Sequence, residues 1–315
     1  MNLHLHKQTK ILKEAALRHG FMGAGISKAE FMGEEAVRLE DWLGKGYHGE
    51  MSYMANHFDL RVDPTKLVPG AKSVVSLMYN YFPGKEEAET LKVSQNGSFK
   101  ISRYAYGEDY HKVVRRKLKS LVKELKDEFG DFHARVFVDS APIMERDWAK
   151  RSGQGWVGKN TLLINPGKGS YFFLAEIILD VEFEYDNPIR DHCGTCTRCI
   201  DACPTDAISP EGYVLDGSKC ISYLTIELKS NIPETFHGQM QDWIFGCDIC
   251  QEVCPWNRFA KPHAEPTFEM KEKLQGMGSG DWLELTEEIF EGLFSKSALK
   301  RAGYEKLMNT IHIRQ

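Results

Sequence analysis

Two cysteine-rich stretches decide how this chain of 315 residues is organised: CGTCTRCIDACP at residues 193–204 and CDICQEVCP at residues 247–255. All eight cysteines of the chain lie between Cys193 and Cys254. The first stretch has the C-x2-C-x2-C-x3-C-P spacing with which bacterial ferredoxins bind 4Fe-4S clusters, the fourth thiolate reaching a second cluster. The second stretch lacks the first cysteine of that spacing, and Cys220 is the cysteine left to replace it.

Exchange of one cysteine between the two motifs predicts two interlocked 4Fe-4S sites. The first is expected on Cys193, Cys196, Cys199 and Cys254. The second is expected on Cys203, Cys220, Cys247 and Cys250. A pair of structural zinc sites is the alternative, because zinc also binds four thiolates. Zinc ribbons use cysteine pairs, so a triple run ending in Cys-Pro favours the clusters.

Composition predicts a folded protein of about two domains. Apolar residues make up 42% and charged residues 27% of the chain, and 40 basic against 45 acidic residues give a net charge of -5. This balance excludes a globally basic nucleic-acid binder. Clustered cysteines indicate a reducing compartment. The N-terminus, MNLHLHKQTK, lacks an apolar signal region, and no run reaches the roughly 18 apolar residues of a membrane span. We therefore expect a cytoplasmic protein that does not enter a membrane.

Helical and strand patterns interleave through residue 185, which predicts an α/β or an α+β fold, and we expect α+β for the chain. Apolar spacing predicts helices at 9–18, 34–43, 110–129, 140–153, 282–294 and 297–308. Apolar runs predict strands at 21–26, 73–82, 134–138 and 171–183, and the polar stretch 86–99 is expected on the surface. The cysteine-rich segment 191–259 has too few aliphatic residues for a core of its own, so its clusters should organise it.

The sequence resembles the epoxyqueuosine reductase family, cobalamin-dependent iron-sulfur enzymes that complete queuosine in tRNA. The resemblance covers nearly the whole chain, and longer members add a helical-repeat tail beyond this length. It is carried by both cysteine motifs together with HGEMSYM (48–54), PGAKSVVSLMYNY (69–81), SRYAYGEDYHKVVR (102–115) and VDSAPIMERDWAKRSGQGWVGKNTLLI (138–164). It implies a cobalamin-binding catalytic domain of α/β type at 1–185, a ferredoxin-like domain at 186–262 and a short helical segment at 263–315.

The resemblance implies that Asp139 is the proton donor of the reaction. Expelling an epoxide oxygen as water requires protonation, and a carboxyl group beside a bulky apolar cofactor can stay protonated near neutral pH. The alternative is that Asp139 only caps the helix expected after it.

The resemblance also places Tyr104, Tyr106, Tyr110 and His111 near the cofactor and the modified base, although they also fit a helix start with interfacial tyrosines. We expect no histidine on the cobalt, because the D-x-H-x-x-G motif is absent. The segment GQGWVGKN (153–160) nearly matches a phosphate-binding loop, but Asn160 replaces the hydroxyl and a helix is expected before it, which argues against an ATPase. Its glycines would instead approach the corrin. The cofactor-binding candidates are therefore Arg61, Tyr104, Tyr106, Tyr110, His111, Gly155, Lys159 and Ser222.

Partners are expected from charge and chemistry. The helix at 110–129 carries a basic strip that would neutralise tRNA phosphates, unless it is only a solvated face. Its members are Lys112, Arg115, Arg116, Lys119, Lys123 and Lys126, with Lys150 and Arg151 expected nearby. We also expect an external low-potential electron donor and a monomer.

Two other functions fit parts of the sequence. A corrinoid reductive dehalogenase is the first, but the export signal common in that class is absent. A ferredoxin-like electron-transfer subunit is the second, but about 190 residues precede the first cysteine.

Overall fold

The structure is a computed structural model that describes residues 3–84 and 99–313. Its centre is a sheet of antiparallel neighbours in the order β1-β2-β7-β4. The stretch 86–99, which is expected on the surface, lies outside the described residues except for Phe99. The four strands are β1 (Gly23–Lys28), β2 (Ser73–Asn80), β4 (Ala134–Phe137) and β7 (Phe172–Leu179), each overlapping a strand predicted from sequence.

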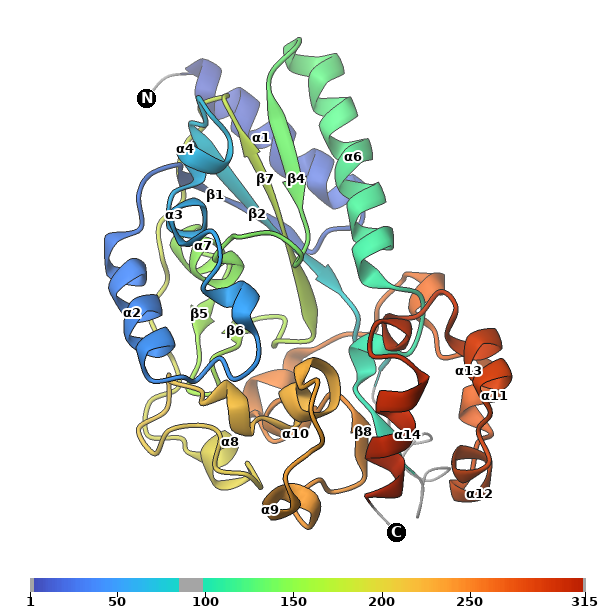
Figure 1. The fold of residues 1–315 in the computed structure, drawn as a ribbon. Coiled ribbons are helices and arrows are strands. Elements are labelled where there is room, and N and C mark those ends of the chain that lie inside the picture. The colour runs from blue at the N-terminus through green and yellow to red at the C-terminus, as the bar shows by residue number, and fades with distance from the viewer. Residues whose placement is uncertain (1–2, 85–98, 314–315) are drawn as a thin grey trace.

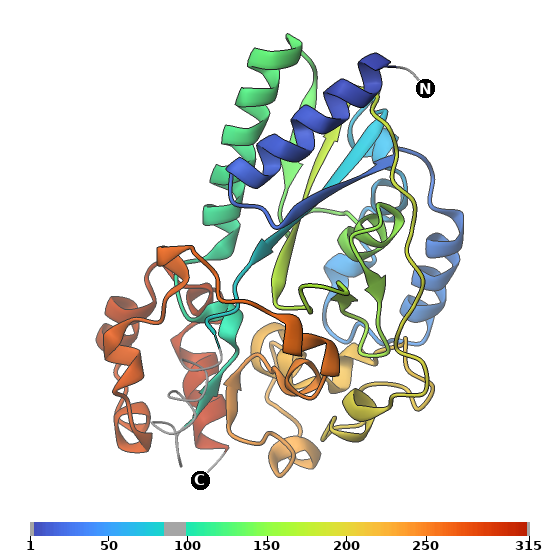
Figure 2. The same ribbon diagram turned by 180° about the vertical axis from the view of Figure 1, so that it is seen from behind.

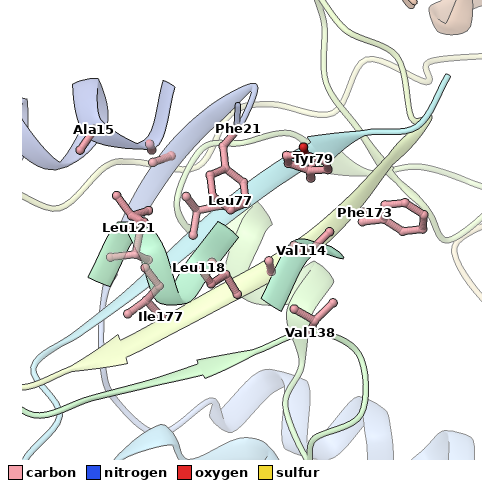
Figure 3. Close-up of a cluster of buried hydrophobic side chains, with 14 of the residues drawn as sticks. Ala15, Phe21, Leu77, Tyr79, Val114, Leu118, Leu121, Val138, Phe173 and Ile177 are labelled. Atoms are coloured by element: carbon pink, nitrogen blue, oxygen red, sulfur yellow. The ribbon is translucent and has the colours of Figure 1, made fainter. Parts of the chain in front are cut away.

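One face of the sheet is covered by α1 (Leu3–Arg18) and α6 (Tyr110–Phe129). The helix predicted at 110–129 is confirmed at both ends. Its buried side chains Val114, Leu118 and Leu121 point at the sheet, where they meet the apolar residues that alternate along β2 and β7 (Figure 3). This helix starts beside the end of the sheet where the site described below is found (Figure 1).

The opposite face carries α7 (Glu145–Arg151), whose Trp148 is fully buried. The helix predicted at 140–153 therefore starts later than expected. Asp139 has a φ of +58°, and the backbone N–H groups of Ser140 and Ala141 donate to the carbonyls two residues earlier. These tight turns delay the helix, and the idea that Asp139 caps it is wrong, because the residue before its first turn is Met144. The other helices of this layer are α2 (Gly33–Gly44), α3 (Phe58–Val62) and α4 (Pro64–Leu67), with the short turn η1 (Ser52–Met54).

The segment after α7 forms a hairpin of β5 (Trp156–Val157) and β6 (Leu163–Ile164). The argument against an ATPase holds, because no strand leads into this glycine-rich segment. Gly155 lies close to the partner strand: a Cβ atom there would be 2.4 Å from the Ile164 carbonyl oxygen.

The cysteine-rich part has little regular structure, as predicted. A strand from the first part of the chain, β3 (Lys100–Ile101), pairs in parallel with β8 (Trp243–Phe245) of this part. The two regions are therefore joined through a shared sheet as well as along the chain (Figure 1). Its other elements are α8 (Arg198–Asp201), η3 (Gly217–Lys219), the π-helical turn η4 (Tyr223–Glu227), α9 (Glu234–His237), α10 (Ile249–Glu252) and η5 (Pro255–Phe259); η2 (Arg103–Ala105) follows β3.

The C-terminal segment packs against β3, η2 and β8 through a separate apolar core (Figure 2). The two helices predicted here are broken: Thr286 accepts a backbone N–H group and starts α13 within the first, and Gly303, with a φ of +84°, separates η7 from α14 in the second. No helix among the described residues is long and apolar enough to cross a membrane. The segment contains η6 (Pro266–Phe268), α11 (Glu272–Gln275), α12 (Ser279–Leu283), α13 (Glu287–Phe294), η7 (Ala298–Arg301) and α14 (Tyr304–His312).

Candidate active site and cluster-binding region

Asp139 follows the end of β4 and turns its carboxyl group toward the start of α6. Its left-handed backbone is uncommon outside glycine, and aspartate is among the residues that tolerate it. Asp139 Oδ2 lies 2.9 Å from His111 Nε2, and 53% of the Asp139 side chain is exposed. The carboxyl group is therefore held by the fold and is also open to a substrate.

His111 is fixed from its other side by Asp109. Asp109 caps α6 by accepting the His111 backbone N–H at 3.1 Å, and its Oδ1 lies 2.7 Å from His111 Nδ1. Burial alone would lower the pKa of His111, but the hydrogen bonds to Asp109 and Asp139 outweigh it and raise that pKa. Burial would likewise raise the pKa of Asp139, but the hydrogen bond from His111 lowers it. These directions favour the proton of the pair on His111, and protonation of Asp139 beside a bound cofactor stays a prediction.

Arg301 of the C-terminal segment also reaches this pair. Its Nη1 lies 2.7 Å from His111 Nε2. Arginine can only donate, so this contact is a hydrogen bond when Nε2 has lost its proton. Arg301 can thus donate to His111 once Nε2 is deprotonated, while its charge lowers the pKa of Asp139.

Stacked rings form a wall beside the pair. The Tyr110 ring lies between His111, with centroids 4.0 Å apart, and Phe173, with centroids 4.1 Å apart. Tyr104 meets the edge of Tyr110 at 6.0 Å. Burial first and then the charge of Asp139 raise the pKa of both tyrosines, so they stay neutral donors. Tyr106 lies apart from this wall, in the apolar core of the C-terminal segment.

A buried cation, Arg61 on α3, contacts the loop that carries Tyr53. Only 7% of it is exposed, its Nη2 donates to the Tyr53 carbonyl oxygen at 3.0 Å, and its Nε has no hydrogen-bond partner among the described residues. Burial and then the charges of Glu227 and Asp139 raise the pKa of the Tyr53 hydroxyl, while the charge of Arg61 lowers it. A buried donor without a partner among the described residues fits a cofactor with polar side groups.

The electrostatic neighbours of two thiols are compatible with the sets predicted from sequence, and the assignment of all eight cysteines stays a prediction. In the first, burial and the neighbouring thiols Cys193, Cys254 and Cys196 raise the pKa of Cys199 to about 11. In the second, burial and the neighbours Cys220 and Cys203 raise the pKa of Cys247. Half-buried thiols near one another lose their protons readily only when metal ions take up the charge, so these thiols are compatible with iron-sulfur clusters.

A buried ion pair joins the second cysteine set to the active-site segment. Asp248, next to Cys247, accepts from the Arg103 backbone N–H and from Arg103 Nη1, each at 2.9 Å. Arg103 Nη2 also donates to Glu252 at 2.6 Å. Because Arg103 precedes Tyr104 directly, this network sets the distance between the ring wall and the second cluster site.

The HGEMSYM loop makes a second link between the two regions. The Glu50 backbone N–H donates to the Tyr223 hydroxyl at 2.8 Å, and the Glu50 carboxylate accepts from Ser230 Oγ at 2.8 Å. Gly49 has a φ of +55°, and a Cβ atom there would lie 2.4 Å from the Tyr223 hydroxyl oxygen. Only glycine satisfies both conditions. The loop that carries Tyr53 is thereby fixed to η4, next to Cys220.

Comparison with known proteins identifies the family. Residues 61–140 match the family described as epoxyqueuosine reductase QueG, DUF1730, and residues 192–257 match the 4Fe-4S double cluster binding domain. The epoxyqueuosine reductase of Cyclobacterium marinum is 57% identical over 309 residues, covering 98% of this chain and 97% of that protein. The chain belongs to the epoxyqueuosine reductase family. This membership decides against the dehalogenase and the electron-transfer subunit.

Solved epoxyqueuosine reductases share the fold. A crystal structure with an epoxyqueuosine-modified tRNA-Tyr stem loop has a TM-score of 0.85 at 30% identity, over 98% of this chain and 80% of that one. The epoxyqueuosine reductase from Bacillus subtilis, in a structure with its catalytic loop swung out of the active site, has a TM-score of 0.84 at 29% identity. The match covers 98% of this chain and 81% of that one. The predicted α+β fold is confirmed.

Three of the cofactor-binding candidates of this epoxyqueuosine reductase make contacts within the chain that support its own loops and strands. Gly155 packs against β6, as described above. Lys159 Nζ donates to the carbonyl oxygens of Gly194 at 2.8 Å and Cys196 at 3.1 Å, so it supports the first cysteine loop. Ser222 precedes η4, and its hydrogen bonds oppose the effect of burial on the pKa of Cys220. Their roles toward a cofactor stay predictions.

The basic strip is only partly as predicted. A shallow hollow on α6 is lined by Lys112, Arg115, Arg116, Lys119, Ser120 and Lys123. Lys150 and Arg151 do not join it, because α7 lies on the opposite face of the sheet and Arg151 Nη2 pairs with Glu35 at 2.8 Å. The expectation that they extend the strip is wrong.

Sequence reasoning missed several side chains that surround Asp139. Glu145 accepts the Asp139 backbone N–H at 2.6 Å, and Glu176 lies fully buried behind it. An acidic residue within the apolar run YFFLAEIILDV was a signal for Glu176. Tyr53 and Arg301 left no such signal, because only tertiary structure brings them to the site.

Proposed function

We propose that this chain reduces the epoxide of epoxyqueuosine in tRNA to give queuosine, using cobalamin and two 4Fe-4S clusters. The observation that carries the proposal is the Asp139–His111 pair, open to solvent on one side, in a chain that belongs to the epoxyqueuosine reductase family. It works as a cytoplasmic monomer that takes electrons from an external low-potential donor.

The stoichiometry of the reaction assigns a role to the pair. Both carbon–oxygen bonds of the epoxide break, a carbon–carbon double bond forms, and the oxygen leaves as water, so two electrons and two protons are consumed. The proton held on His111 Nε2 passes over 2.9 Å to Asp139, which donates it to the leaving oxygen, and the second proton reaches the pair from solvent. General acids of this kind contribute about 10²–10⁴-fold to the rate.

Cobalamin supplies the strongly reducing centre of the reaction when it is bound. Arg61, with its unpartnered Nε, and the wall of Tyr104 and Tyr110 are the side chains that would hold it. The partly buried tyrosine rings offer an apolar surface, and their hydroxyls are donors for polar groups. Cys193, Cys196, Cys199 and Cys254 hold one cluster; Cys203, Cys220, Cys247 and Cys250 hold the other.

The tRNA would lie along the basic hollow of α6, which starts at the active-site residues Tyr110 and His111. Phosphate contacts make affinity fall as salt rises. We therefore expect the double variant Lys119→Met, Lys123→Met to flatten the slope of log Kd against log salt by about 0.7–0.9 for each lost contact. Lys150→Met, on the opposite face of the sheet, is the control and should keep the slope. An unchanged slope in the double variant would remove α6 from the tRNA interface.

Anaerobic reconstitution tests the activity itself. Protein loaded with iron, sulfide and cobalamin is supplied with a low-potential reductant and tRNA that carries epoxyqueuosine. Mass spectrometry of the digested nucleosides should show loss of one oxygen from the modified base. Conversion that is equally fast without added cobalamin would contradict the proposed cofactor, and no conversion with all components would contradict the function.

A further inference from the structure

Behind Asp139 lies a second pair of acidic groups that the proposed reaction does not use. Glu145 begins α7, and its Oε1 accepts the Asp139 backbone N–H at 2.6 Å. Glu176 lies on β7, opposite Ser76 of β2 and Phe137 of β4, and none of it is exposed. It therefore faces the α7 side of the sheet, in the middle of the apolar layer.

Glu176 has no ordinary partner for a carboxylate. Neither of its oxygens accepts from an N–H or hydroxyl group among the described residues. The side chain that meets it is Glu145, and two carboxyl groups form a hydrogen bond only when one carries a proton. A buried carboxylate without a cation or a donor is strongly unfavourable, so the proton must reside in this pair.

The backbone of Asp139, next to the pair, depends on a hydrogen bond to keep its conformation. Asp139 has a φ of +58°, a left-handed conformation that residues with a side chain rarely adopt. Its N–H group has Glu145 as its acceptor, while the following residues make only tight turns within the loop. The direction of the Asp139 carboxyl group therefore depends on where Glu145 is held.

We propose that Glu145 and Glu176 share one proton and that this pair holds Asp139 in the turn that presents its carboxyl group to the substrate. Glu176 is the donor, Glu145 is the acceptor for both Glu176 and the Asp139 N–H, and both are positioning residues. The inference rests on the proposed role of Asp139. Burial and the nearby charge of Asp139 also raise the pKa of Glu145 to about 7, and burial raises that of Glu176.

The other charged and titratable groups near Glu145 and Glu176 do not donate a hydrogen bond that could replace the shared proton. Asp139 at the end of β4 adds negative charge, and Tyr110 on α6 stays neutral. Arg146 lowers the pKa of Glu145, but its Nη1 donates to the Thr161 carbonyl oxygen at 2.6 Å. None of these groups supplies a donor to Glu176.

Two measurements on the reconstituted holoenzyme test the pair without relying on turnover. Infrared difference spectra of wild type minus Glu176→Gln at pH 8 should contain the C=O stretch of a neutral carboxylic acid, shifted in D2O. Hydrogen exchange of the peptide that contains Asp139 should be about tenfold faster in Glu145→Ala, the ratio expected for losing a hydrogen bond. The matched control Glu145→Gln keeps an acceptor oxygen and should keep the protection.

The outcomes separate this inference from the proposed function. No acid band in the difference spectrum would overturn the shared proton, and unchanged exchange in Glu145→Ala would overturn the anchor. If Glu145→Ala does not fold, loss of protection in the folded Glu145→Gln variant would contradict the anchor, and retained protection together with the band would support it. Both readouts stand even if the enzyme acts on another substrate. For turnover, Glu176→Gln should match wild type at pH 7, because its amide replaces the proton donor.

Discussion

Replacing Asp109 by asparagine isolates the electrostatic support of His111 from the structure of the helix. Asparagine caps a helix about as well as aspartate, so α6 should still begin at Tyr110. The charge is lost, however, from an acceptor that lies 2.7 Å from His111 Nδ1 and has only 14% of its side chain exposed. A hydrogen bond between charged groups exceeds one to a neutral acceptor by about 1–2 kcal/mol. That difference corresponds to a fall of about one unit in the pKa of His111.

The assay is the pH dependence of the single-turnover rate with saturating tRNA. Because the pKa of His111 is raised in the wild type, the protonated pair persists to higher pH and is lost as pH rises through that pKa. In Asp109→Asn the alkaline limb should move to lower pH by about one unit, while the plateau below it keeps its rate. The exposed Asp127→Asn variant of the same helix is the control. An alkaline limb that does not move would refute the placement of the resting proton on His111.

Two further substitutions test neighbouring contacts. Trp156 Nε1 donates to Cys193 Sγ at 3.4 Å. In a redox titration, Trp156→Phe should therefore make the potential of the first cluster more negative by about 20–60 mV, whereas the control Trp282→Phe in the C-terminal core should not change it. An unchanged potential in Trp156→Phe would exclude the hydrogen bond. Arg301→Met should slow single turnover by about two- to tenfold, because the hydrogen bond to deprotonated His111 is lost. Lys300→Met is its control, and equal rates in the two variants would remove Arg301 from proton transfer.

The sequence was sufficient where spacing alone determines the structure. Strict cysteine spacing predicted the double cluster domain, and the period of apolar residues predicted the helix at 110–129, because both features depend on local geometry. The start of α7 was not predictable in the same way. Ser140, Pro142 and a following acidic run favour a helix, but the left-handed Asp139 and its tertiary hydrogen bond to Glu145 prevent it from starting there.

Most of the surroundings of Asp139 were beyond sequence reasoning for a similar reason. Arg301 meets His111 across 190 positions of the chain, through a segment whose packing on β3 and β8 has no periodic signature. The basic strip was overextended to Lys150 and Arg151, because proximity in sequence does not tell which face of a sheet a helix covers. Side chains that act through tertiary contacts need the structure to be found.

The central claim is that Asp139 delivers the proton during reduction of epoxyqueuosine in tRNA. The most direct measurement is single-turnover conversion by reconstituted Asp139→Asn, followed by mass spectrometry of the released nucleoside. Asparagine keeps the size of the side chain but has no acidic proton, so we expect the rate to fall by about 10²–10⁴-fold while both clusters and tRNA binding are retained. A variant with those properties that converts epoxyqueuosine at the wild-type rate would contradict the claim.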